Sequence, residues 1–228
     1  MTRRSIAAVL AFLVARGVLL ACAAAILIPA RAGILLNVVI VAIDLATISV
    51  LIVIIRRQQG SVRRFLGPFS ARHDLPLAAL TLFALFIGLA VGAFIGNAIV
   101  YAGPPPERSY VTTVPIWVGL WSILVMPITV AIAEELLYRG WAHERLLQVW
   151  RPWLVVAVIA IAFGLQHAPL SATSLGEAAV RVIATGIAGA VLGVLRQRGV
   201  SLWALMIGHW AFDVVGLGLP ALAQAVAA

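Results

Sequence analysis

The chain has 228 residues, of which 64% are hydrophobic and only 11% charged, and its mean hydropathy is +1.12. A soluble domain carries about 25% charged residues, so this composition excludes a water-soluble globular protein. The net charge of +8 comes from 16 basic residues, all of them arginine, against 8 acidic ones. Because the arginines stand between apolar stretches, they are typical of cytoplasmic loops in a membrane protein and disfavour nucleic-acid binding.

Seven apolar stretches are long enough to cross a bilayer as helices. In chain order we expect these spans at about residues 6–29, 34–55, 75–101, 113–150, 153–169, 175–195 and 201–219. The first stretch is too long for the apolar part of a signal peptide and another follows at once, so it is interpreted as a retained span. The tail at 220–228 is predicted to be an extra turn or a short eighth segment.

The arginines cluster on alternate connections, which predicts a topology. The N-terminus, the loop at 56–64, the bend between spans four and five, and the loop at 196–199 all carry arginines and are predicted to be cytoplasmic. The fold class is therefore predicted as an all-α, polytopic transmembrane helix bundle of seven to eight spans, forming one integral membrane domain. The arginine-rich, lysine-free composition favours a bacterial cell (inner) membrane with a cytoplasmic N-terminus.

Two pairs of opposite charges lie inside apolar stretches, where a charge costs about 2.5–3.5 kcal/mol and so calls for a partner or a function. Arg16 and Asp44 lie at similar depth on the first two spans and are predicted to form an interhelical ion pair. Glu177 and Arg181 are four residues apart on one helix face and are expected to satisfy each other.

The fourth span carries two consecutive acids, in the sequence Glu134-Glu135-Leu-Leu-Tyr-Arg139. Glu135 and Arg139 are four residues apart, with the acid N-terminal to the base, which favours an ion pair within the helix. Glu134 is turned about 100° away from that face and has no partner in its own helix. The structural alternative is that Glu134 pairs with an arginine on another helix.

Further polar residues occur at helical spacing in the fifth and seventh spans. Phe163 and His167 share one helix face, as do His209 and Asp213. At 1.5 Å per residue, Glu134 and His167 both lie roughly 24–26 Å from the bend that joins their helices. His209 reaches the same level if the polar tip at 141–150 projects beyond the membrane. We therefore predict a shared buried site containing Glu134, His167, His209 and Asp213.

These three motifs, as Glu134-Glu135-Leu-Leu-Tyr-Arg139, Phe163-Gly-Leu-Gln-His167 and His209-Trp-Ala-Phe-Asp213, resemble those of the CPBP family, which are EExxxR, FxxxH and HxxxN/D. This family comprises the type II CAAX prenyl proteases and bacterial relatives that include bacteriocin-processing and immunity proteins. The resemblance covers about residues 115–219. It predicts a catalytic core of four or more spans at 111–228, behind three N-terminal spans at 1–110 that carry no family motif.

The resemblance implies an intramembrane endopeptidase with Glu134 as the catalytic glutamate, His167 as its histidine partner and His209 and Asp213 as transition-state stabilisers. On this hypothesis Glu134 with His167 deprotonates a water and His209 donates to the oxyanion. An ionised aspartate only accepts hydrogen bonds, so Asp213 is expected to orient His209 or to keep it protonated. Phe163 has a supporting role, and Glu135 with Arg139 forms a structural ion pair.

Alternatives remain open at this point. The mechanism is expected to need no cofactor, but the two histidines and two carboxylates Glu134, His167, His209 and Asp213 also make a plausible zinc set. A non-hydrolytic peptide-binding or immunity protein, or a small transporter that uses the buried acids as a proton relay, would use the same helices differently. The expected partners are the lipid bilayer and a peptide or membrane-protein substrate. We expect a cavity beside the loop at 168–176, with access from the cytoplasm.

Overall fold

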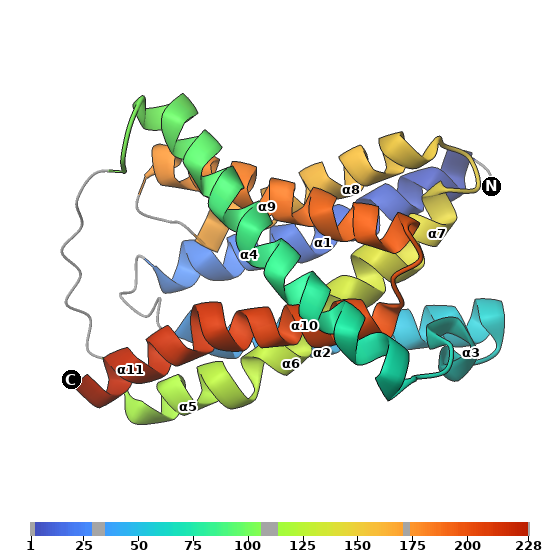
Figure 1. Ribbon diagram of the computed structural model, residues 1–228, viewed down its shortest axis with the longest axis horizontal. Coiled ribbons are helices and arrows are strands. Elements are labelled where there is room, and N and C mark those ends of the chain that lie inside the picture. Colours follow the sequence, from blue (N-terminus) through green and yellow to red (C-terminus); the bar gives the residue numbers. More distant parts are fainter. Residues whose placement is uncertain (1–2, 29–34, 106–113, 171–173, 228) are drawn as a thin grey trace.

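The computed structural model describes residues 3–28, 35–105, 114–170 and 174–227 of the chain (Figure 1). All secondary structure within these ranges is helical. Seven segments are long and apolar enough to span a membrane, at Ser5–Leu27, Leu36–Gln58, Ala71–Tyr101, Ile116–Leu146, Pro152–Leu170, Leu175–Gln197 and Leu202–Ala227. The predicted all-α, multi-pass membrane fold is therefore confirmed.

Four of these spans are single helices, namely α1 (Arg3–Leu27), α2 (Leu36–Gln59), α4 (Ala71–Tyr101) and α9 (Leu175–Gln197). The short helix α3 (Val62–Leu66) connects α2 to α4. The fifth span consists of α8 (Pro152–Leu165) followed by a 3-10 turn, η3 (Ala168–Leu170).

Two spans contain π-helical turns, in which the backbone is wider than in an α-helix. The fourth span is made of α5 (Ile116–Leu124), α6 (Met126–Glu134), the π-helix η2 (Glu135–Ala142) and α7 (His143–Leu146). The seventh is made of α10 (Leu202–Asp213), the π-helix η4 (Val214–Gly218) and α11 (Leu219–Ala227). The tail thus continues the seventh span as far as Ala227 and does not form a separate eighth one.

The helices that carry large apolar side chains on all sides face lipid on their outer surfaces. Phe94 of α4 and Ile26 of α1 are 76% and 70% exposed, respectively. A soluble helix would carry polar residues at such positions, whereas lipid accepts apolar ones. Fewer than half of the residues in each span are buried inside the bundle. Many of the buried positions carry polar residues or glycine.

α4 crosses the bundle diagonally and packs against both α9 and α10 (Figure 1). Its glycines Gly88, Gly92 and Gly96 face α9 at intervals of one turn. A Cβ on Gly92 would lie only 2.7 Å from Cα of Ala184, so the two backbones are in direct contact there. Close packing of small residues is a main source of helix association in a bilayer, because the hydrophobic effect contributes little to association between helices there.

The glycines of α9 also allow close packing. A Cβ on Gly189 would lie 2.9 Å from the ring of Phe163, and one on Gly193 would lie 3.2 Å from Val156, both on α8. α9 is therefore held between α4 and α8, and it brings Phe163 toward the interior.

The arginine-bearing connections that the structure describes gather at one end of the bundle, together with the N-terminus, α3 and α7 (Figure 1). We call this the arginine end. The C-terminus, the start of α5 and the end of α4 lie at the other end (Figure 1). A buried carboxylate closes the arginine end, because Asp74 of α4 accepts a hydrogen bond of 2.6 Å from Ser201 at the start of α10.

The polar tip at 141–150, which was expected to project from the bundle, is packed into it over its first half. Trp141, His143 and Leu146 are 7%, 2% and 0% exposed, and the two apolar side chains belong to the main core cluster. The first half of the tip therefore packs against α1 and α8, whereas residues 147–149 are exposed.

Gly92→Leu is expected to separate α4 from α9 and to lower the free energy of unfolding by about 1–3 kcal/mol, the usual cost of overpacking. The measurement is unfolding of the purified protein in mixed micelles. Ala90→Leu, on the exposed face of the same helix, is the matched control and should change stability by less than about 0.5 kcal/mol. Equal stability of the two variants would show that the contact does not matter.

Candidate active site

Three spans bring their polar residues together in the middle of the bundle. Glu134 and Glu135 lie at the junction of α6 and η2, His209 and Asp213 lie on α10, and His167 follows α8. Nε2 of His209 lies 3.8 Å from Oε2 of Glu134 and 3.6 Å from Oδ2 of Asp213. The residues that were predicted to share a site from their depth alone therefore lie together.

His209 is fixed from its other side by Glu135. Nδ1 of His209 lies 2.8 Å from Oε1 of Glu135, and since a carboxylate only accepts, Nδ1 carries the proton. The predicted pair of Glu135 and Arg139 is also formed, at 3.1 Å, and Arg139 donates in addition to the carbonyl of Gly189 at 3.0 Å. Glu135 thus belongs to the site as well as to a structural ion pair, which the sequence analysis did not anticipate.

Glu134 pairs with an arginine on another helix, the alternative that sequence analysis left open. Arg16 of α1 donates to Oε1 of Glu134 at 2.7 Å and to Oδ1 of Asp44 on α2 at 2.7 Å. The predicted pair of Arg16 and Asp44 is therefore only part of a larger group. All three side chains are buried, at 3%, 1% and 0% exposure respectively.

Gln166 completes the contacts of Glu134 and was missed by sequence reasoning. Its Nε2 donates to Oε1 of Glu134 at 3.1 Å, while its Oε1 accepts from Arg16 at 2.6 Å and from the hydroxyl of Tyr138 at 2.9 Å. The signal available in the sequence was a lone amide next to His167 in an otherwise apolar span. Because an amide both donates and accepts, Gln166 links the arginine to the carboxylate.

Three carboxylate oxygens of the site are buried without a hydrogen bond among the described residues, namely Oε2 of Glu134, Oε2 of Glu135 and Oδ2 of Asp213. Oε2 of Glu134 and Oδ2 of Asp213 face Nε2 of His209 at 3.8 and 3.6 Å, beyond hydrogen-bond range. Buried polar atoms normally have a partner, so these oxygens remain available as acceptors for a water or a bound substrate.

His167 and Phe163 form the wall of the site on the α8 side. Nδ1 of His167 lies 2.7 Å from the carbonyl of Phe163, which only accepts, so this nitrogen carries the proton and Nε2 is left as an acceptor. The Phe163 ring lies 4.9 Å from the His167 ring and 6.4 Å from the His209 ring, and the Arg139 guanidinium lies 4.3 Å from its centroid. Phe163 therefore packs against both histidine rings of the site.

A cavity of about 690 Å³ adjoins the site between α4, α8, α9 and α10. His167, His209 and Asp213 line it, whereas Glu134 lies behind them. The predicted cavity is therefore present, but the loop beside which it was expected does not line it. Of that loop, residues 171–173 lie outside the described ranges, and those described at 168–170 and 174–176 are not among the lining residues.

The residues fit a metal ion poorly. Within the described ranges, no three side chains of histidine, cysteine, aspartate or glutamate are arranged to hold one. Oε1 of Glu134 is taken by Arg16 and Gln166, and Oε1 of Glu135 by Arg139 and His209. A cation at Glu134 would also lie beside the fixed positive charge of Arg16.

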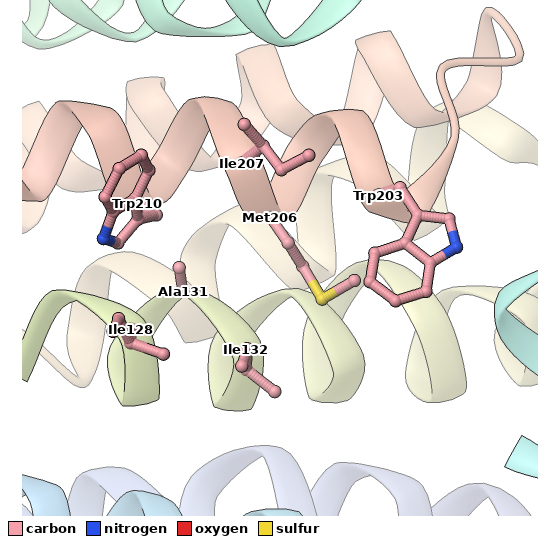
Figure 2. Close-up of a pocket in the computed structure, with 7 residues that line it drawn as sticks. All are labelled: Ile128, Ala131, Ile132, Trp203, Met206, Ile207 and Trp210. Carbon is pink, nitrogen blue, oxygen red and sulfur yellow. The ribbon is translucent and has the colours of Figure 1, made fainter. Parts of the chain in front are cut away.

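A second, smaller pocket of about 220 Å³ lies between α6 and α10 and is almost wholly apolar. Trp203 and Trp210 stand at its two ends, with Met206 between them (Figure 2). Nε1 of Trp203 donates to the carbonyl of Gly67 at 3.1 Å, so this tryptophan ties α10 to the connection before α4. The pocket contains none of the polar residues of the site.

Comparison with known proteins gives a match to a protein family. The family model described as Type II CAAX prenyl endopeptidase Rce1-like matches residues 115–215, the segment that carries all three motifs. No curated protein and no solved structure is significantly similar to the chain. The resemblance drawn from the motifs is confirmed, and the matched segment of this multi-pass membrane protein is similar to the Rce1-like CAAX endopeptidases.

Proposed function

We propose that the protein hydrolyses a peptide bond of a membrane-associated substrate with a water activated by Glu134, without a metal. The single observation that carries this proposal is the free oxygen Oε2 of Glu134, buried and directed toward Nε2 of His209 at 3.8 Å. Oε1 of the same carboxylate is held by Arg16 and Gln166, so Oε2 has a fixed direction. A base whose orientation is fixed before substrate binds needs no reorganisation during the reaction.

The pairing with Arg16 does not remove the negative charge at Glu134. Arg16 is shared with Asp44, so one positive charge faces two carboxylates. Glu135 and Arg139 balance each other, and Asp213 adds a further carboxylate within 3.6 Å of His209. This excess of acids favours a doubly protonated His209, whose Nε2–H would donate to the oxyanion that forms on the scissile carbonyl.

The proposed steps conserve atoms and charge. The water oxygen attacks the scissile carbonyl carbon, and the proton that it loses passes to Oε2 of Glu134. Collapse of the tetrahedral intermediate breaks the C–N bond, and Glu134 delivers the same proton to the leaving amine. The unprotonated Nε2 of His167 accepts a hydrogen bond from the water and orients it.

The orienting role first assigned to Asp213 goes to Glu135 in this proposal. Glu135 holds Nδ1 of His209 at 2.8 Å, whereas Asp213 lies on the Nε2 side at 3.6 Å. Asp213 therefore stabilises the positive charge of the His209 ring and accepts from the water. It does not determine which nitrogen of His209 carries the proton. Glu134 and Glu135 are adjacent in sequence, and they face the two nitrogens of the same imidazole, that of His209.

A capture-only or immunity role, or a proton relay for transport, would use the same buried acids. Neither role requires a carboxylate oxygen that is held free next to two imidazoles. The family match favours hydrolysis over both alternatives.

Glu134→Gln is expected to lower kcat by about 10²- to 10⁴-fold, because the amide cannot take a proton from water. His167→Ala should also lower activity. Both are measured with purified protein on a library of membrane-anchored peptides, with cleavage detected by mass spectrometry. Glu144→Gln, a partly exposed acid on the same span that pairs with Arg196 at 3.0 Å, is the control and should retain activity. Full activity in both site variants would exclude the enzyme proposal.

Arg16→Met is expected to lower kcat by about 10²-fold with little change in KM, because Glu134 loses its orientation. This variant also leaves two buried acids unbalanced, so it can fail to fold. The double variant Arg16→Met with Asp44→Asn restores the charge balance. If Arg16 positions Glu134, the double variant regains thermal stability but not kcat. Recovery of both would show that Arg16 only stabilises the bundle.

Exhaustive chelation with EDTA and 1,10-phenanthroline is expected to leave the cleavage rate unchanged, because Glu134 and His209 activate the water without a metal. The zinc version of the mechanism gives the opposite result, with activity lost on chelation and regained on adding zinc. Metal analysis of the purified protein by mass spectrometry accompanies the rate measurement.

A further inference from the structure

The cavity beside the active site is not centred on it but extends toward one end of the bundle. From His209 and His167 it reaches Asn97 and Tyr101 near the end of α4, and Glu177 and Arg181 in the first two turns of α9. These helix ends lie at the end of the bundle opposite to the arginine end (Figure 1). None of the residues that line the cavity comes from α6.

The arginine end, in contrast, is closed by packed side chains. Leu192, Leu205 and Val200 form an apolar cluster there with Ala78 and Leu85, and all five are buried. The hydrogen bond from Ser201 to Asp74 joins α10 to α4 beyond this cluster. A substrate approaching from the arginine end would have to displace these contacts, whereas the opposite end leads directly into the cavity.

Arginine-rich connections remain on the cytoplasmic side of a bilayer, so the end into which the cavity leads faces away from the cytoplasm. This orientation favours access from the side opposite to the cytoplasm, whereas the sequence led us to expect cytoplasmic access. That expectation relied on a polar tip at 141–150, of which the first half is packed into the core.

We propose that the active site is loaded from the extracytoplasmic side, by an extended segment of a membrane protein where it leaves the bilayer. This inference rests on the proposed function, since it names the substrate of the same site. A volume of about 690 Å³ accepts a short extended peptide but not a folded domain.

The lining of the cavity specifies the chemistry of that segment. Near the catalytic residues the wall is apolar, with Leu85, Phe86, Leu89 and Phe212, so apolar side chains next to the scissile bond fit there. Toward the outer end the wall becomes polar. The Tyr101 hydroxyl lies there, buried and without a hydrogen-bond partner among the described residues. It is placed to donate to a backbone carbonyl of the substrate, since an extended peptide leaves its carbonyls unpaired.

The side of access is tested by cysteine labelling, which needs no substrate. Cys22 is replaced by serine, and Asn97→Cys then reports on the cavity. Leu175→Cys marks the same end of the bundle and Arg198→Cys marks the arginine end. A membrane-impermeant maleimide is added to sealed vesicles of each orientation. Asn97→Cys should be labelled from the side that labels Leu175→Cys and is extracytoplasmic. Labelling from the side of Arg198→Cys, or no labelling from either side, would overturn the proposal.

Occupation of the cavity by substrate is tested separately in detergent, where both ends are accessible. Ala93→Trp places a bulky ring in the cavity and should abolish cleavage of the membrane-anchored peptide library, while Ala98→Trp on the exposed face of α4 should retain it. Tyr101→Phe should raise KM roughly 2- to 10-fold with kcat unchanged, the loss expected for one hydrogen bond.

The two proposals fail in different ways. If the wild-type protein cleaves no peptide in detergent, the proposed function fails whatever the labelling shows. If cleavage depends on Glu134 but Ala93→Trp cleaves as fast as Ala98→Trp, the catalytic proposal stands and the proposed substrate path is wrong.

Discussion

The arrangement of the site depends on one buried arginine that faces two carboxylates. In a medium of low dielectric constant, an unpaired charge is costly, and Arg16 is stabilised only because Asp44 and Glu134 both reach it. The same contacts fix α1, α2 and α6 relative to one another at mid-depth. Two acids on one base also leave the group with a negative charge. In the proposed mechanism, the interaction that stabilises the bundle is therefore also the one that leaves Glu134 the negative charge that a general base needs.

The π-helix η2 determines how the two adjacent acids are used. Widened turns of this kind often occur at functional sites, because they change the direction of side chains within a continuous helix. Glu134 ends α6 and turns to Arg16, whereas Glu135 begins η2 and turns to Arg139 and His209. The unpaired oxygen of Glu134, Oε2, nevertheless faces the other nitrogen of His209, Nε2. Two consecutive residues thereby contact opposite edges of one ring.

Much of this arrangement follows from the sequence, for physical reasons. Apolar length predicts the seven spans, and helical spacing predicts the pair of Glu135 and Arg139. Depth predicts that Arg16 meets Asp44, but it cannot show that a third partner is within reach, because rotation about the helix axis is set by packing. For the same reason Gln166, one residue before a motif histidine, could not be assigned to the site. The division of the chain at residue 110 stays a prediction, although Arg16 ties its two parts together.

The position of Arg16 on the first span has a consequence for biosynthesis. The arginine enters the bilayer long before Glu134 has been synthesised, and a charge near the bilayer centre costs about 2.5–3.5 kcal/mol on insertion scales. Asp44, on the very next span, can neutralise it at once, so the first two helices can insert together as a charge-paired hairpin. Glu134 then joins a pair that is already in place. In this order of assembly, Asp44 neutralises Arg16 in the membrane until the later helix that carries Glu134 has been inserted.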